Sequence, residues 1–104
     1  MPEGTTTALL LLAGLQAVQA PPLARQAELM HRLKHDCGSC HGMTLKGGLG
    51  PPLLPEALAG KDRDGLAAIV LNGVPGTPMP PWDIEISAAE AAWLVARLQQ
   101  GIAP

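Results

Sequence analysis

The apolar positions along the chain predict helices and no strand of useful length. Residues 23–35 carry apolar side chains at helical spacing, and we expect this helix to end at Asp36. Residues 62–72 carry a second apolar face behind an aspartate at the expected N-cap, and this helix closes near Gly73. Nothing alternates with a period of two for long, so the predicted fold class is all-α.

The strongest helix start signal in the chain opens the last helix, over residues 87–100. Ser87 and Glu90 form an S-x-x-E pair, in which each side chain bonds a backbone N–H near the start of the helix. The apolar positions that follow repeat at helical spacing, and they are Ala91, Leu94, Val95, Leu98 and Ile102.

Glycine and proline dominate the segments between these helices and number 12 and 11 of the 104 residues. No helical or strand period persists through residues 37–60, and this segment is predicted to be a long loop that wraps around the core. Residues 73–86 read as an extended segment that prolines stiffen. The pattern therefore predicts three to four helices held by long irregular loops, without an internal repeat.

The first twenty residues differ from the rest. Residues 8–20 are an apolar stretch that is too short to span a bilayer and suits the apolar part of a secretory signal, and Val18-Gln19-Ala20 offers small residues for cleavage. No Lys or Arg precedes this stretch, and Pro21 would follow the cut; an uncleaved apolar anchor or a buried helix is the alternative. We predict a signal peptide over 1–20, one exported domain over 21–104 and no membrane span.

Composition sharpens this picture. Apolar residues make up 47% of the chain but aromatic residues only 2%, namely Trp82 and Trp93. Large aromatic side chains usually supply much of the burial in a small domain, about 150–250 Å² each, so something else must fill the middle. The net charge of −2, without a basic stripe, argues against a nucleic-acid partner.

Both cysteines lie in the string Cys37-Gly38-Ser39-Cys40-His41. This is C-x-x-C-H, the attachment pattern for c-type haem. Two thiols at this spacing can reach the two vinyl groups on one side of a porphyrin, while the adjacent imidazole points at the iron. We therefore predict one covalent haem c on Cys37 and Cys40 with His41 as an iron ligand, and this haem supplies the missing aromatic core.

Three other uses of the cysteines are less compatible with the sequence. A thioredoxin-like dithiol requires strands around the motif, and none is predicted. A zinc site has the right ligand types but no familiar spacing; its donors would be Cys37, Cys40 and two of His31, His35 and His41. A disulfide across four residues would be strained.

The second face of the iron needs another ligand, for which the candidates are Met30, Met43, Met79, His31 and His35. A ligand that reaches around the ring must be distant in sequence, and Met79 has that distance. It lies between Pro78 and Pro80, which hold the loop rigid enough to present a thioether. The alternatives are a methionine that fills the core, a histidine ligand and an open position.

These residues, in this order, resemble class I cytochromes c over roughly residues 23–100. The resemblance rests on a helix, C-x-x-C-H-G, a Gly-Pro-x-Leu loop, a short helix, a Met-Pro loop and a C-terminal helix. It implies that the carbonyl of Pro51 accepts a hydrogen bond from His41 and that Leu53 packs on the haem.

The string Gly-Thr-Pro-Met-Pro-Pro-Trp around Met79 is similar to that of small periplasmic cytochromes associated with haem-d-containing nitrite reductase in denitrifying bacteria. The resemblance implies a periplasmic one-electron carrier rather than an enzyme. Its partner would be nitrite reductase or an enzyme that matures the d-type haem. A haem enzyme or gas-ligand sensor with an open sixth iron position is the alternative.

The resemblance breaks down where the first and last helices cross. Leu29, Leu33 and Arg97 stand where the family has a glycine and two aromatics, and Trp93 is the expected substitute. A weak crossing would let two chains exchange the last helix, so we expect a monomer or a swapped dimer. Charges are also unequal along the sequence: Arg25, Arg32, Lys34 and Lys46 flank the motif, and Asp83, Glu85 and Glu90 follow Met79. Either this asymmetry orients a redox partner or these are ordinary solvated charges.

Overall fold

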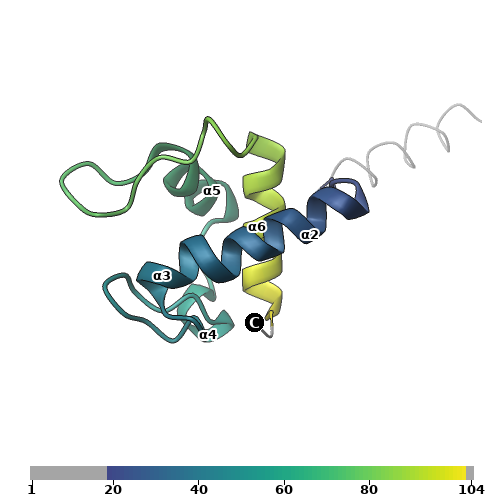
Figure 1. Ribbon diagram of the computed structural model, residues 1–104. Coiled ribbons are helices and arrows are strands. Elements are labelled where there is room, and N and C mark those ends of the chain that lie inside the picture. The colour runs from purple at the N-terminus through teal and green to yellow at the C-terminus, as the bar shows by residue number, and fades with distance from the viewer. Residues whose placement is uncertain (1–18, 103–104) are drawn as a thin grey trace, which may run out of the picture.

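The computed structural model describes residues 19–102, which form helices and loops and contain no strand. The elements are α2 (Leu23–Arg32), a π-helical turn η1 (Leu33–Cys37), α3 (Gly38–His41), α4 (Pro55–Leu58), α5 (Arg63–Asn72) and α6 (Ala88–Gln100). In Figure 1, α2 crosses α6, with α5 and α4 beside that crossing. The predicted all-α class is confirmed. The predicted signal peptide lies almost entirely outside the described range, and no helix within that range is long and apolar enough to cross a membrane.

The first helix is longer than predicted. It does not end at Asp36 but continues through η1 and α3 to His41, so the loop starts five residues later than the sequence indicated. The backbone N–H of Gly38 donates to the carbonyl of Leu33, which closes the wide π turn. The helix stops at Gly42, whose φ of 93° lies in the region that favours glycine.

The other helices begin where local chemistry places them. α4, which lies inside the predicted loop, is one turn started by Pro55, whose fixed φ suits a first helical position. The Asp62 side chain caps α5 by accepting from the Gly65 N–H at 2.8 Å. Ser87 and Glu90 form both bonds of the capping box at α6, at 3.1 and 2.9 Å, as the sequence predicted.

The core is built around the α2 and α6 crossing. Leu29 of α2, which stands where the resemblance implies a glycine, and Ala91 of α6 are both fully buried. Trp93, which the sequence offers as a substitute aromatic at this crossing, is buried on α6, and the Arg97 guanidinium lies 6.0 Å from its ring centroid. The rest of the core is mostly aliphatic and comprises Leu33, Leu45, Leu58, Ala67, Ile86, Leu94, Val95 and Leu98.

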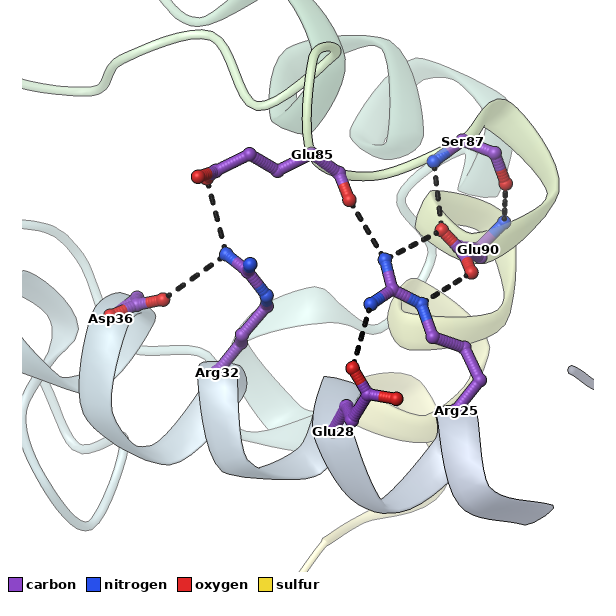
Figure 2. Close-up of polar contacts among 7 residues, drawn as sticks. All are labelled: Arg25, Glu28, Arg32, Asp36, Glu85, Ser87 and Glu90. Atoms are coloured by element: carbon purple, nitrogen blue, oxygen red, sulfur yellow. Dashed lines mark hydrogen bonds and ion pairs between the residues drawn. The ribbon is translucent and has the colours of Figure 1, made fainter. Parts of the chain in front are cut away.

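A network of ion pairs joins α2 to the start of α6 (Figure 2). Arg25 donates from Nε to Glu90 at 2.7 Å and from Nη2 to the Glu85 carbonyl at 2.8 Å. About two turns along α2, Arg32 pairs with the Glu85 carboxylate at 3.1 Å and with Asp36 at 3.7 Å. The hypothesis that this charge asymmetry orients a redox partner is therefore wrong for these residues, because the fold places their opposite charges next to one another.

The Glu90 carboxylate is the centre of this network. Its hydrogen bonds from Arg25 and from the Ser87 backbone N–H lower its pKa from 4.5 to about 2. The charged form of Glu90 is therefore stabilised in the folded protein more than in the unfolded chain. A depressed carboxyl pKa contributes stability that is fully present above pH 4.5 and is lost as the pH falls toward 2.

Replacement of Glu90 by glutamine tests this contribution. Glutamine can keep the capping box but cannot carry the charge. Glu90→Gln should therefore lower the thermal midpoint at pH 6, and the difference in midpoint between variant and wild type should shrink as the pH falls from 4.5 to 2. The measurement is thermal unfolding by circular dichroism across this pH range. Glu56→Gln is the control, since Glu56 is exposed and makes no ion pair with another described residue. A constant gap at every pH would contradict the assignment.

Candidate functional site

The two cysteines and His41 lie within the last five residues of the first helix. Cys37 ends η1, and Cys40 and His41 belong to α3. Both cysteines are free and half-buried. Burial, with smaller effects of Asp36 and Cys40, raises the pKa of the Cys37 thiol to about 11. A thioredoxin-like dithiol needs a lowered pKa, so the site disfavours that alternative.

The His41 imidazole is held by the loop that follows it. Its Nδ1 atom lies 2.7 Å from the carbonyl oxygen of Pro51, which is the contact that the family resemblance implies. A carbonyl oxygen can only accept, so Nδ1 carries a proton, and in the neutral imidazole with this tautomer the lone pair is on Nε2. An imidazole fixed in this tautomer is suited to bind iron through Nε2, and the hydrogen bond raises its basicity.

Glycines in the same loop allow this close approach. A Cβ atom on Gly50 would lie 2.7 Å from Cε1 and Nδ1 of the His41 ring, and one on Gly48 would lie 2.8 Å from the Cys40 carbonyl oxygen. The Gly50 N–H donates to Cys40 O, and the Gly47 N–H donates to His41 O, both at 2.8 Å. These bonds satisfy carbonyls at the end of α3. Sequence reasoning missed these glycines, although their density after the motif was visible.

The remaining predicted site residues lie on two loops. Pro51 is exposed, and Leu53 is half-buried, packs on the core and donates its N–H to Leu45 O at 2.9 Å. Met79 is half-buried in the segment between α5 and α6. In Figure 1, this segment and α3 extend to the same side of the molecule, away from the α2 end. No hydrogen bond between described residues joins residues 73–82 to the motif.

Several large apolar side chains on these segments are exposed, which fits a site for an apolar group. Met43 and Leu49 on the loop after α3 are 49% and 76% exposed, and Ile69 and Val74 beside the Met79 segment are 43% and 39% exposed. Large exposed apolar side chains are available for contact with another apolar body. A porphyrin is such a body.

The donors that the zinc alternative needs are not assembled. Within residues 19–102, no three His, Cys, Asp or Glu side chains come together as a group that could hold a metal ion. His31 and His35 contact each other on the first helix, with ring centroids 4.2 Å apart. The thiols, the fixed imidazole and the apolar surroundings therefore fit a covalently attached haem better than a bare ion.

Comparison with known proteins gives consistent results. Residues 24–96 match the family model described as cytochrome C oxidase, cbb3-type, subunit III. A cytochrome c55X of Pseudomonas aeruginosa is 58% identical over 94 residues, which cover 89% of this chain and 78% of the relative. A solved structure of a c-type cytochrome NirC is 61% identical, with a TM-score of 0.79 over 81% of this chain and 100% of that one.

A further relative is much longer than this chain. A protein of Pseudomonas aeruginosa named dihydro-heme d1 dehydrogenase is 37% identical over 97 residues. The match covers 93% of this chain but only 18% of that protein. One part of the dehydrogenase is therefore similar to the present chain as a whole.

Gly50 provides a direct test of the His41 geometry. Gly50→Ala should displace the imidazole or the loop and destabilise the haem-loaded protein by about 1–3 kcal/mol, the usual cost of overpacking. The measurement is thermal unfolding, with the visible spectrum as a second readout. Gly38→Ala is the matched control, because Gly38 is helical and its added Cβ would meet Met43 Sδ at an ordinary 3.4 Å. Equal stability of the two variants would refute the packing argument.

Proposed function

This chain belongs to the small c-type cytochromes that include the cytochromes c55X, and on that premise we propose that it is a periplasmic one-electron carrier. The family has the class I cytochrome c fold and carries covalently bound haem c, and Cys37 and Cys40 fit its attachment motif. The observation that carries the proposal is the 2.7 Å contact between His41 Nδ1 and Pro51 O, which leaves Nε2 free for iron.

We assign the two axial positions to His41 and Met79. A haem whose iron is held by both side chains would leave no place for a substrate and would supply a one-electron couple. A thioether ligand suits Fe(II) and raises the reduction potential. The protein's part is to fix the imidazole through Pro51, to cover the ring with Leu53 and to present the methionine from a stiff loop.

The proposed partners follow from the relatives. One of them is named a dihydro-heme d1 dehydrogenase, and removal of two hydrogens from a dihydro-haem releases two electrons and two protons. A one-electron carrier takes up such electrons in two successive encounters. We propose that this chain exchanges electrons with such a maturation enzyme or with the haem-d-containing nitrite reductase itself.

Export is part of the same proposal. The apolar stretch 8–20 supports a signal peptide over residues 1–20, which would leave residues 21–104 as the monohaem domain in the periplasm. A dimer that exchanges α6 would form the same Arg25–Glu90 ion pair between two chains, so this pair is compatible with both the monomer and the swapped dimer.

The axial assignment is tested by replacing two methionines. The oxidised wild-type protein should show the methionine to Fe(III) charge-transfer band at the red edge of the visible spectrum. Met79→Ala should lose this band and bind carbon monoxide when reduced. Met43→Ala is the matched control and should keep the band, since Met43 is exposed and lies two residues from His41.

The assignment would be overturned if the wild-type protein lacked the band and readily bound carbon monoxide. It would favour instead the alternative function, a haem enzyme or gas-ligand sensor with an open sixth position.

Partner exchange is tested by stopped-flow mixing. The reduced protein is mixed with oxidised nitrite reductase, and the oxidised protein with the dehydrogenase and its dihydro-haem substrate. Because Arg25 and Arg32 are paired with acidic groups, the rate should fall less than about tenfold from low to physiological ionic strength. If small reductants reduce the protein but it exchanges electrons with neither enzyme, these two partners are ruled out. The protein would still be an electron carrier.

A further inference from the structure

The segment that carries Met79 has few backbone donors. Residues 73–82 include four prolines, at positions 75, 78, 80 and 81, and each lacks an N–H. The segment is anchored at its two ends, where Gly73 N–H donates to Ile69 O at 2.8 Å and Trp82 N–H donates to Val70 O at 3.1 Å. Both anchors lie on α5, so the interior of the segment must be held by other contacts.

Two contacts hold the backbone of Met79 itself. Its carbonyl oxygen accepts from the Val74 N–H at 3.1 Å. Its N–H bonds no backbone carbonyl of a described residue and donates to the side-chain oxygen of Thr77 at 3.3 Å. Close packing accompanies these bonds, since a Cβ on Gly73 would lie 2.7 Å from the Met79 carbonyl oxygen.

The Thr77 hydroxyl completes a closed arrangement. While it accepts from Met79 N–H, it donates to the Val74 carbonyl oxygen at 2.7 Å. A hydroxyl has one proton and two lone pairs, so it can make both bonds at once. Val74 thus binds Met79 directly through its N–H and indirectly through Thr77. These are the two side-chain hydrogen bonds of residues 73–82 that join described residues.

We propose that Thr77 is a positioning residue for the Met79 thioether. Its hydroxyl fixes the peptide on the N-terminal side of Met79, which sets the direction in which that side chain leaves the loop. A ligand held in its binding conformation loses less conformational entropy on binding, so the hydroxyl strengthens the bond of Met79 to iron. Thr77 is exposed and contributes nothing to the core. This inference rests on the proposed axial role of Met79.

The experiment compares Thr77→Val, which keeps the shape and removes the hydroxyl, with Thr77→Ser, which keeps the hydroxyl. Each oxidised, haem-loaded protein is titrated with imidazole, which competes with Met79, while the red-edge charge-transfer band is followed. Loss of one hydrogen bond predicts half-loss of the band at an imidazole concentration about 2- to 10-fold lower for Thr77→Val. Thr77→Ser should restore the wild-type midpoint.

Thr44→Val is the matched control. Thr44 is also exposed, makes no side-chain hydrogen bond with another described residue and lies on the loop after α3. Its midpoint should equal that of the wild type. Thr77→Ala also removes the hydroxyl and should show the same lowered imidazole midpoint as Thr77→Val. The second variant keeps the test usable if one of the two gives little folded protein.

The outcomes separate the two proposals. A wild type with no band defeats the axial role of Met79. A wild-type band that disappears in Met79→Ala, together with an unchanged midpoint in Thr77→Val and Thr77→Ala, defeats the positioning role alone. Equal weakening in Thr77→Val and Thr77→Ser would also defeat it, because the hydroxyl would then not be the group that acts.

Discussion

One carboxylate connects the parts of this molecule that have to stay in register. Glu90 caps α6 through Ser87 and holds Arg25 of α2 across the helix crossing, and the same guanidinium reaches the Glu85 carbonyl (Figure 2). α2 leads directly into the cysteine motif, and Glu85 lies near the end of the segment that carries Met79. The helix that leads to His41 is therefore bonded both to the start of α6 and to the chain that follows Met79.

This arrangement shows how the family's helix crossing tolerates different residues. Leu29 on α2, and Ala91 and Trp93 on the last helix, are all buried. Apolar packing tolerates substitutions of similar volume, so by itself it fixes the geometry of a crossing only loosely. The directional bonds of Arg25 and Arg32 supply the geometry that an aliphatic crossing lacks.

Local signals in the sequence predicted much of the site, and long-range contacts were beyond them. The capping box of α6, the Asp62 cap and the C-x-x-C-H motif each depend on residues within a few positions, so pattern alone finds them. The passage of the first helix through a π turn and the single turn α4 leave no readable period. The pairing of Arg25 with Glu90, 65 residues apart, exists only because the fold brings two helices together. Thr77 was invisible for a related reason, since its role depends on which backbone donors the neighbouring prolines remove.

The scarcity of aromatic residues is also visible in the composition of the core. The buried side chains are mostly leucine and alanine, with Trp93 as the aromatic member of the core. These side chains pack the helices against one another, while Met43 and Leu49 on the loop after the motif, and Ile69 and Val74 near the Met79 segment, stay exposed. A haem bound at Cys37 and Cys40 brings a large planar apolar surface to those segments, and burial of apolar surface stabilises the fold at roughly 25 cal/mol per Å². In the proposed function the cofactor would serve both as the redox centre and as a large aromatic surface for a chain that has only two aromatic side chains of its own.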